Sequence, residues 1–211
     1  SSDLRKYCIT VGREFCSGGI ETAKQVADAL DMAYYDKEII DKTAEMMNLS
    51  KDIIASHDEK PVSYLQSGAF QYNVMWYEGD PSLLLSPSVR IAETQFKVIQ
   101  EAAKKGPAVF VGRCADFALR DFDHVLHVFI RADLEIRIAR CMQIFSLSAD
   151  KAKKLIHKTD KIRADYYNRY SGQTWGDITN NHLIIDAGTL GIDLSAELIC
   201  KTIKDLEARV K

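Results

Sequence analysis

The stretch "ITVGREFCSGGIETAK" (residues 9–24) decides the fold. A short β-rich apolar run leads into a turn with three small residues, Ser17, Gly18 and Gly19, and apolar residues at helical spacing follow. Phosphate-binding loops have this layout, because backbone N–H groups at a helix N-terminus hold anionic oxygens. The usual Gly-Lys-Ser/Thr ending is missing: Gly19 stands at the lysine position and Ile20 at the hydroxyl position. Taken alone, the turn is equally compatible with a structural role.

Composition allows one domain with a substantial core, since the chain has 211 residues and is 46% hydrophobic. A formal net charge of −2 gives no bulk reason to expect nucleic acid or a membrane surface as a partner. The five cysteines are scattered without a Cys-x-x-Cys pair, which predicts reduced thiols in a cytoplasmic protein. Buried apolar packing is the favoured role for Cys16 and Cys114, with reactivity the alternative. We also expect no signal peptide and no membrane span.

Apolar runs alternate with helical patterns along the chain. The predicted strands are residues 7–12, 33–35, 107–112, 124–130 and 182–188. This alternation predicts an α/β fold, a doubly wound parallel sheet of about five strands with helices on both faces. In such sheets ligands bind beyond the carboxyl ends of the strands. The residues that leave the strands at that edge are 12–13, 36, 112–116 and 186–189.

Cations near this edge are candidates for phosphate binding. Arg13 and Lys24 flank the glycine turn, and either could partly replace a missing lysine. Arg113 follows a buried strand, where an arginine is costly unless it is paired or faces a ligand, and its planar fork suits phosphate. The alternative for Arg113 is a salt bridge to Asp116 or Asp36.

A basic run lies in the long helical pattern after residue 148. Its members are Lys151, Lys153, Lys154, Lys158, Lys161, Arg163 and Arg169. Such a run is most often a solvated helix face, yet a phosphoryl-transfer enzyme needs cations that close over the migrating group. Both interpretations stay open. The five histidines are dispersed and form no metal-ligand pattern, and neither a nucleophile elbow nor a dinucleotide fingerprint is present.

The chain resembles the cytidylate kinase-like family, a branch of the P-loop nucleoside monophosphate (NMP) kinases. The stretches that carry the resemblance are "ITVGREFCSGG", "YYDKEII", "VFVGRCADFALRD", "KTDKIRADYYNRYSGQTWGD" and "DAGTLGI", in family order over nearly the whole chain. The resemblance implies a single P-loop NMP-kinase-like domain, 1–211. Its core is residues 7–56, 89–145 and 182–211, with an NMP-binding insert at about 57–88 and a helical lid at about 146–175.

The resemblance also implies roles for individual residues. The donor-nucleotide set is Gly12, Cys16, Ser17, Gly18, Gly19, Ile20, Glu21 and Thr189. The acceptor set is Asp36, Arg90, Arg113 and Asp116, and the catalytic cations are Arg13, Lys161, Arg163 and Arg169. Arg13 is the expected replacement for the absent lysine. No metal ligand is assigned, although Mg is expected with ATP as phosphoryl donor.

The function that follows is ATP-dependent phosphoryl transfer to a nucleoside monophosphate, with CMP or dCMP first. Two departures from true CMP kinases, Gly19 and Val111, bear on magnesium handling and rate. The alternatives are a nucleotide-binding sensor with little or no catalysis and a kinase for another small phosphate acceptor. Small-molecule nucleotides are the expected partners, without nucleic acid or membrane, and a homodimer stays open.

Overall fold

The computed structural model describes residues 7–58 and 87–209 of the chain. Its sheet has five strands in the order β2-β3-β1-β4-β5, and every neighbouring pair is parallel. The strands are β1 (Cys8–Arg13), β2 (Ala33–Tyr35), β3 (Ala108–Val111), β4 (Val125–Arg131) and β5 (Leu183–Asp186). The predicted doubly wound parallel sheet is confirmed, and each expected strand is present.

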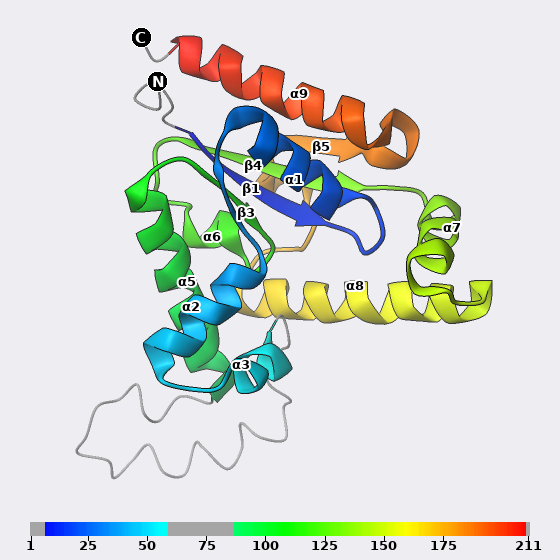
Figure 1. Ribbon diagram of the computed structural model, residues 1–211, viewed down its shortest axis with the longest axis horizontal. Helices are drawn as coiled ribbons and strands as arrows, with labels where there is room; N and C mark the ends of the chain where they lie inside the picture. The colour runs from blue at the N-terminus through cyan, green and yellow to red at the C-terminus, as the bar shows by residue number, and fades with distance from the viewer. Residues whose placement is uncertain (1–6, 59–86, 210–211) are drawn as a thin grey trace.

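Helices cover both faces of this sheet (Figure 1). They are α1 (Gly19–Leu30), α2 (Lys37–Met47), α3 (Lys51–His57), α5 (Pro87–Lys105), α6 (Ala115–Ala118), α7 (Leu134–Phe145), α8 (Ala149–Ser171) and α9 (Ala187–Arg209), with a short 3-10 helix, η4 (Ile178–Asn180). The last helix begins earlier than the sequence pattern indicates, and Gly191 breaks it with a non-helical φ of 77°. The single-turn α6 and η4 were not predicted, because they are too short for a periodic signal.

Alternation along β1 divides the core into two layers. Ile9 and Val11 face α1 and α9, whereas Cys8 faces the opposite layer, which contains Phe110 and α5 residues such as Ile99. All of these side chains are buried, as expected for strands covered on both sides.

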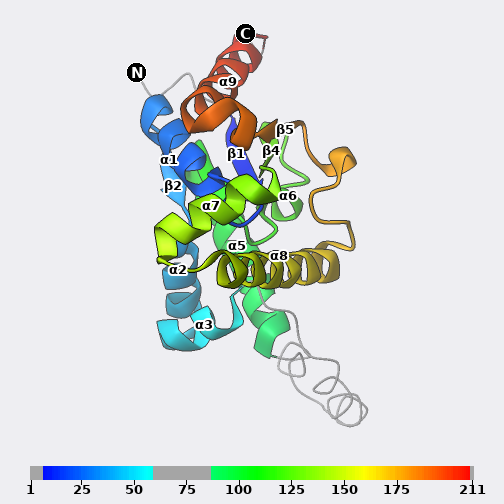
Figure 2. The same ribbon diagram turned by 90° about the vertical axis from the view of Figure 1, so that its right-hand side faces the viewer.

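The topology places β1 in the middle of the sheet, between β3 and β4. Parallel strands end at one edge, so the loop after β1 lies beside the loops after β3 and β4. Helix α8 lies below the sheet in both views, and α7 leads into it (Figure 2). The predicted insert at about 57–88 lies outside the described part of the chain, except for residues 57–58 and 87–88.

Candidate functional site

The glycine loop (residues 12–21) joins β1 to α1 and presents the start of that helix. Gly18, the residue before the helix, has a left-handed φ of 93°. Within the described residues, the backbone N–H groups of Gly18, Gly19 and Ile20 donate to no backbone carbonyl. Ser17 does not face outward, because its hydroxyl donates to the carbonyls of Glu14 at 2.9 Å and Ile130 at 3.2 Å. The helix therefore starts with open amides, which is the arrangement that binds phosphate.

Arg13 occupies the space that a side chain at position 19 would need. A Cβ built on Gly19 would lie 2.5 Å from Arg13 Cβ and 3.2 Å from Arg13 Cγ. Arg13 is only 5% exposed. Lys24, the other candidate cation, is exposed and lies over the Tyr34 ring, with Nζ 5.8 Å from the ring centroid. The geometry therefore favours Arg13 over Lys24 as the cation beside the loop.

Helix α8 carries the predicted lid cations, and the structure separates them. Arg163 is buried; its Nη1 donates to the Arg13 carbonyl at 3.3 Å, and its guanidinium carbon lies 5.5 Å from the centre of the Phe15 ring. Lys161 is exposed and pairs with Asp165 four residues on, and Arg169 is also exposed. Only Arg163 of these three contacts the glycine loop.

Arg113 sits on a strained turn at the end of β3. Gly112, Arg113 and Cys114 all have left-handed φ angles, of 70°, 53° and 52°. For non-glycine residues this conformation costs roughly 1–2 kcal/mol each. Such strain persists where surrounding contacts hold it, and functional sites are common among these places.

Two carboxylates hold the Arg113 guanidinium. Asp58 accepts from Nε at 3.0 Å and from Nη2 at 2.8 Å, and Asp36 accepts from Nη1 at 2.6 Å. Arg113 Nη1 also donates to the Val111 carbonyl at 3.0 Å. Gln95, fully buried, donates to the same Asp58. The salt-bridge alternative for Arg113 is therefore correct, with Asp36 as the partner.

Asp116 instead accepts a hydrogen bond from the hydroxyl of Tyr167 on α8. Burial raises the pKa of Asp116, and the Tyr167 hydrogen bond opposes that rise in part. Burial, followed by the nearby Asp116 charge, raises the pKa of Tyr167 in turn. This hydrogen bond joins α6 to α8 beside the carboxyl edge of the sheet.

Two hollows meet at this edge. A narrow one of about 30 Å³ lies over the ends of β1 and β3; Arg13, Arg113, Arg163 and Asp116 are among its lining residues. The other, about 280 Å³, lies over the glycine loop and is lined by residues 13–21 with Ile144, Phe145 and Arg163. Arg13 and Arg163 line both, so two buried cations stand where the hollows join.

The remaining predicted site residues lie around this centre. Glu21 pairs with Arg140 at 2.7 Å, and Arg140 also donates to the Cys16 carbonyl. Burial, reinforced by the neighbouring Cys141, raises the pKa of Cys16 to about 12, so its thiol stays protonated. The Thr189 amide donates to Asp186 at 3.2 Å. Arg90 is half-buried on α5.

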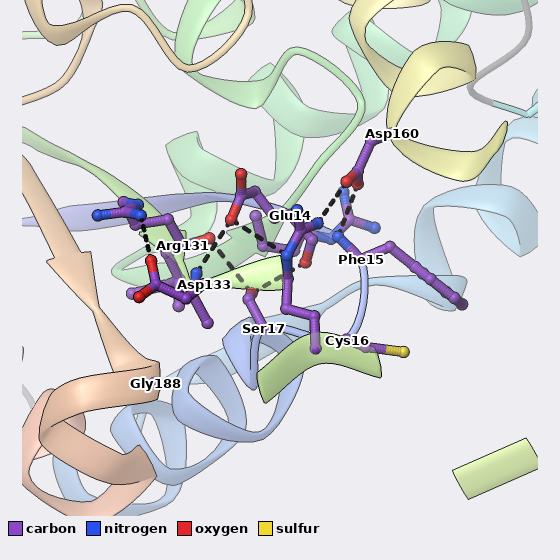
Figure 3. Close-up of polar contacts among 12 residues, drawn as sticks. Glu14, Phe15, Cys16, Ser17, Arg131, Asp133, Asp160 and Gly188 are labelled. Atoms are coloured by element: carbon purple, nitrogen blue, oxygen red, sulfur yellow. Dashed lines mark hydrogen bonds and ion pairs between the residues drawn. The ribbon is translucent and has the colours of Figure 1, made fainter. Parts of the chain in front are cut away.

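Sequence reasoning missed three charged residues of the site. Asp58 holds Arg113, Asp160 accepts from the Phe15 amide at 2.7 Å, and Arg137 pairs with Asp160 (Figure 3 shows the contact to Phe15). Asp160 lies inside the stretch "KTDKIRADYYNRYSGQTWGD", but the many cations around it led us to consider only positively charged side chains there. Nothing in a single sequence pairs Asp58 with Arg113 across 55 residues.

The described residues contain no group of three or more His, Cys, Asp or Glu side chains placed to hold a metal ion. Among the helices of residues 7–58 and 87–209, none is both long and apolar enough to cross a bilayer.

Comparison with known proteins agrees with this fold. The model of the cytidylate kinase-like family matches residues 8–189, and the chain belongs to that family. Its fold and family support a nucleotide-dependent kinase. No curated protein matches the chain.

Solved structures share the architecture. An uncharacterized protein from Eubacterium ventriosum has 26% identity and a TM-score of 0.70, with 94% of this chain and 98% of that chain covered. Shikimate kinase from Bacteroides thetaiotaomicron has 12% identity and a TM-score of 0.54, covering 94% and 98%. A gluconokinase from Sinorhizobium meliloti has 10% identity and a TM-score of 0.53, covering 98% of each chain. At such low identities the two kinases show the fold alone.

Proposed function

We propose that this protein is an ATP-dependent kinase that transfers a γ-phosphoryl group to a nucleoside monophosphate, CMP or dCMP first. One observation carries the proposal: Arg13 fills the space beside Gly19, where the P-loop lysine of a true CMP kinase would begin. The loop thus has a small residue, Gly19, at the lysine position and a cation, Arg13, packed beside it. Burying a cation is costly unless it is paired or faces a ligand, so a buried arginine beside this loop supports phosphate binding.

The donor phosphates bind at the start of α1. The open amides of Gly18, Gly19 and Ile20 hold the phosphate oxygens, and the helix dipole adds a favourable field. Arg13 and Arg163, which line both hollows, neutralise charge on the phosphoryl group as it moves. Phosphoryl transfer needs positioning and positive charge more than covalent chemistry, and the loop amides and the two arginines supply both.

The acceptor binds at the ends of β2 and β3, with Arg113 contacting its phosphate. Most of the N–H groups of Arg113 already donate to Asp36, Asp58 and Val111. An incoming phosphate, with more charge than a carboxylate, therefore exchanges with Asp58 at the guanidinium. The same occupancy favours a second candidate, a kinase for a different small acceptor that leaves the Asp58 pair intact.

Magnesium fits this site poorly on the residues described. Ile20 stands at the position of the hydroxyl that P-loop enzymes offer the ion, and the Glu21 carboxylate is engaged by Arg140. Mg²⁺ would supply charge neutralisation between the outer phosphates when bound with ATP. We assign it no ligand and no step.

The test is ADP production with ATP and Mg²⁺ across a panel of nucleoside monophosphates and of small hydroxylated acceptors without phosphate. We expect turnover with CMP or dCMP, a large loss of kcat in Arg13→Ala, and little change in Lys24→Ala. Turnover only with the acceptors that lack phosphate would replace the first candidate by the second. ATP binding without ADP formation for any acceptor would favour the sensor.

A further inference from the structure

Helix α8 holds the glycine loop through two side chains one turn apart. Asp160 Oδ1 accepts from the Phe15 amide at 2.7 Å, and Arg163 Nη1 donates to the Arg13 carbonyl at 3.3 Å. Residues three apart share a helix face, so both side chains reach the loop together. The negative side chain binds an N–H group and the positive one a carbonyl, which fixes the loop backbone at two nearby points.

A third charged residue, Arg137 of α7, ties Asp160 to the loop's own carboxylate. Arg137 Nη1 donates to Asp160 Oδ2, and its Nε lies 3.6 Å from Glu14 Oε2. Glu14 in turn accepts from the Ala132 amide at 3.0 Å, beyond the end of β4 (Figure 3). The Arg137 side chain is 9% exposed and the Asp160 side chain 17%. The loop is thereby linked to α7, to α8 and to the chain after β4.

Burying such charges does not by itself stabilise a fold, because desolvation offsets most of the attraction. The arrangement does determine which loop amides stay open. Asp160 occupies the Phe15 amide, so an incoming anion meets the amides of Gly18, Gly19 and Ile20 instead.

We propose that Asp160 is a positioning residue for the donor nucleotide, acting through the Phe15 amide and Arg137 to hold the glycine loop open before ATP binds. This inference rests on the proposed function, in which the loop holds the donor phosphates. Of the two α8 side chains that contact the loop, Asp160 acts on loop geometry alone, whereas Arg163 also supplies positive charge. Preorganisation of this kind lowers the cost of binding, because the loop need not be ordered afterwards.

The experiment compares wild type with Asp160→Ala, with the nearly isosteric Asp160→Asn, and with Asp205→Ala as control. Asp205 also carries a carboxylate paired within a long helix, to Lys201 at 2.8 Å, but it lies on α9 and is exposed. The first readout is hydrogen exchange at the Phe15 amide without nucleotide. We expect it to be about ten- to a hundred-fold faster in Asp160→Ala, as for loss of a hydrogen bond to a charged group. Asp160→Asn keeps an acceptor oxygen and should lie between, and Asp205→Ala should match wild type.

The second readout separates ATP from the acceptor. Asp160→Ala should weaken ATP binding and raise the KM for ATP at least ten-fold, while the KM for the acceptor stays within about two-fold, because the contacts of Asp160 are to the donor loop and to Arg137 of α7 and not to Arg113. Unchanged exchange at Phe15 in Asp160→Ala, or faster exchange with unchanged ATP affinity, overturns the inference. If the alanine variant does not fold, the same two measurements on Asp160→Asn decide the question. Wild type that binds ATP without forming ADP refutes the kinase, while hydrogen exchange at Phe15 and the affinity for ATP still decide the role of Asp160.

Discussion

A substitution at Gly19 tests whether Arg13 and a side chain at position 19 compete for the same space. Gly19 is the first residue of α1, with a backbone conformation that any residue can adopt. Alanine there would normally stabilise the helix by up to about 1 kcal/mol. In this protein its Cβ would lie 2.5 Å from Arg13 Cβ and 3.2 Å from Ile130 Cβ, so neighbouring atoms must move.

Overpacking of this kind typically costs about 1–3 kcal/mol, and for two Cβ atoms 2.5 Å apart we expect the upper part of that range, which leaves a net cost of roughly 1–2 kcal/mol after the propensity gain. For a protein of this length, each kcal/mol shifts Tm by roughly 2–4 °C. We therefore expect Gly19→Ala to lower Tm by about 2–8 °C. Truncation of Arg13 to alanine would not relieve the contact, because the nearest atom is Cβ itself. Only Arg13→Gly removes it.

The assay is a double-mutant cycle by thermal unfolding with wild type, Arg13→Gly, Gly19→Ala and the double variant. The cost of Gly19→Ala should fall to near zero or change sign in the Arg13→Gly background, apart from the residual Ile130 contact. In the same background, Gly19→Lys should restore part of the ADP formation lost in Arg13→Gly. An equal Tm loss from Gly19→Ala in both backgrounds would refute competition between the two positions.

Three further predictions concern the residues around the loop. Arg113→Ala should raise the apparent KM for the monophosphate about ten- to a hundred-fold, because a contact worth roughly 1.5–3 kcal/mol is lost. It should also lower Tm, because Asp36 and Asp58 lose their shared partner. An unchanged KM would assign Arg113 to structure alone. Arg163→Ala should lower kcat far more than Lys161→Ala does, because the exposed ion pair between Lys161 and Asp165 contributes little. Equal losses of kcat in the two variants, measured in steady-state assays, would contradict this prediction. Burial, followed by the nearby His182, lowers the pKa of His127 to about 4. Its neutral form therefore contributes stability in full above the unfolded pKa near 6.5, and that contribution is lost as pH falls from there toward 4. Plots of unfolding free energy against pH for wild type and His127→Gln should converge across this window, and parallel plots would show that His127 does not titrate this way.

The sheet could be predicted from the sequence because buried parallel strands are short, continuous apolar runs. "YCITVG" covers β1 except for Arg13, and "PAVFVG" contains β3. The helices between strands carry apolar residues at helical spacing. The glycine loop was equally accessible, since its composition and its place after the first strand both indicate an anion site. Helix α9 was predicted to begin too late because Gly188 and Gly191 indicate a loop, whereas the chain turns helical directly after Asp186.

The polar contacts of the site could not be predicted in the same way. Phe15 and Asp160 are separated by 145 residues, and Arg113 and Asp58 by 55. Periodicity describes which face of an element is buried, but not which charged side chains meet after the elements pack. Asp116 shows the limit: the sequence left Asp36 and Asp116 as equal alternatives for a salt bridge with Arg113, and only the packed structure pairs Arg113 with Asp36 and Asp116 with Tyr167.

The packing of α9 on α1 has a consequence for the protein during its synthesis. A Cβ on Gly18 would lie 3.1 Å from Ile192, and the apolar face of α1, including Val26 and Leu30, shares its core with Ile199 and Ile203. The glycine loop therefore leaves the ribosome well before the helix that completes its surroundings. At the usual rate of roughly 5–20 residues per second the interval is about 10–30 s. During that time α1 exposes part of its apolar face, so in a nascent chain that lacks α9 the glycine loop has its contacts from α7 and α8 but the helix after it lacks an apolar partner.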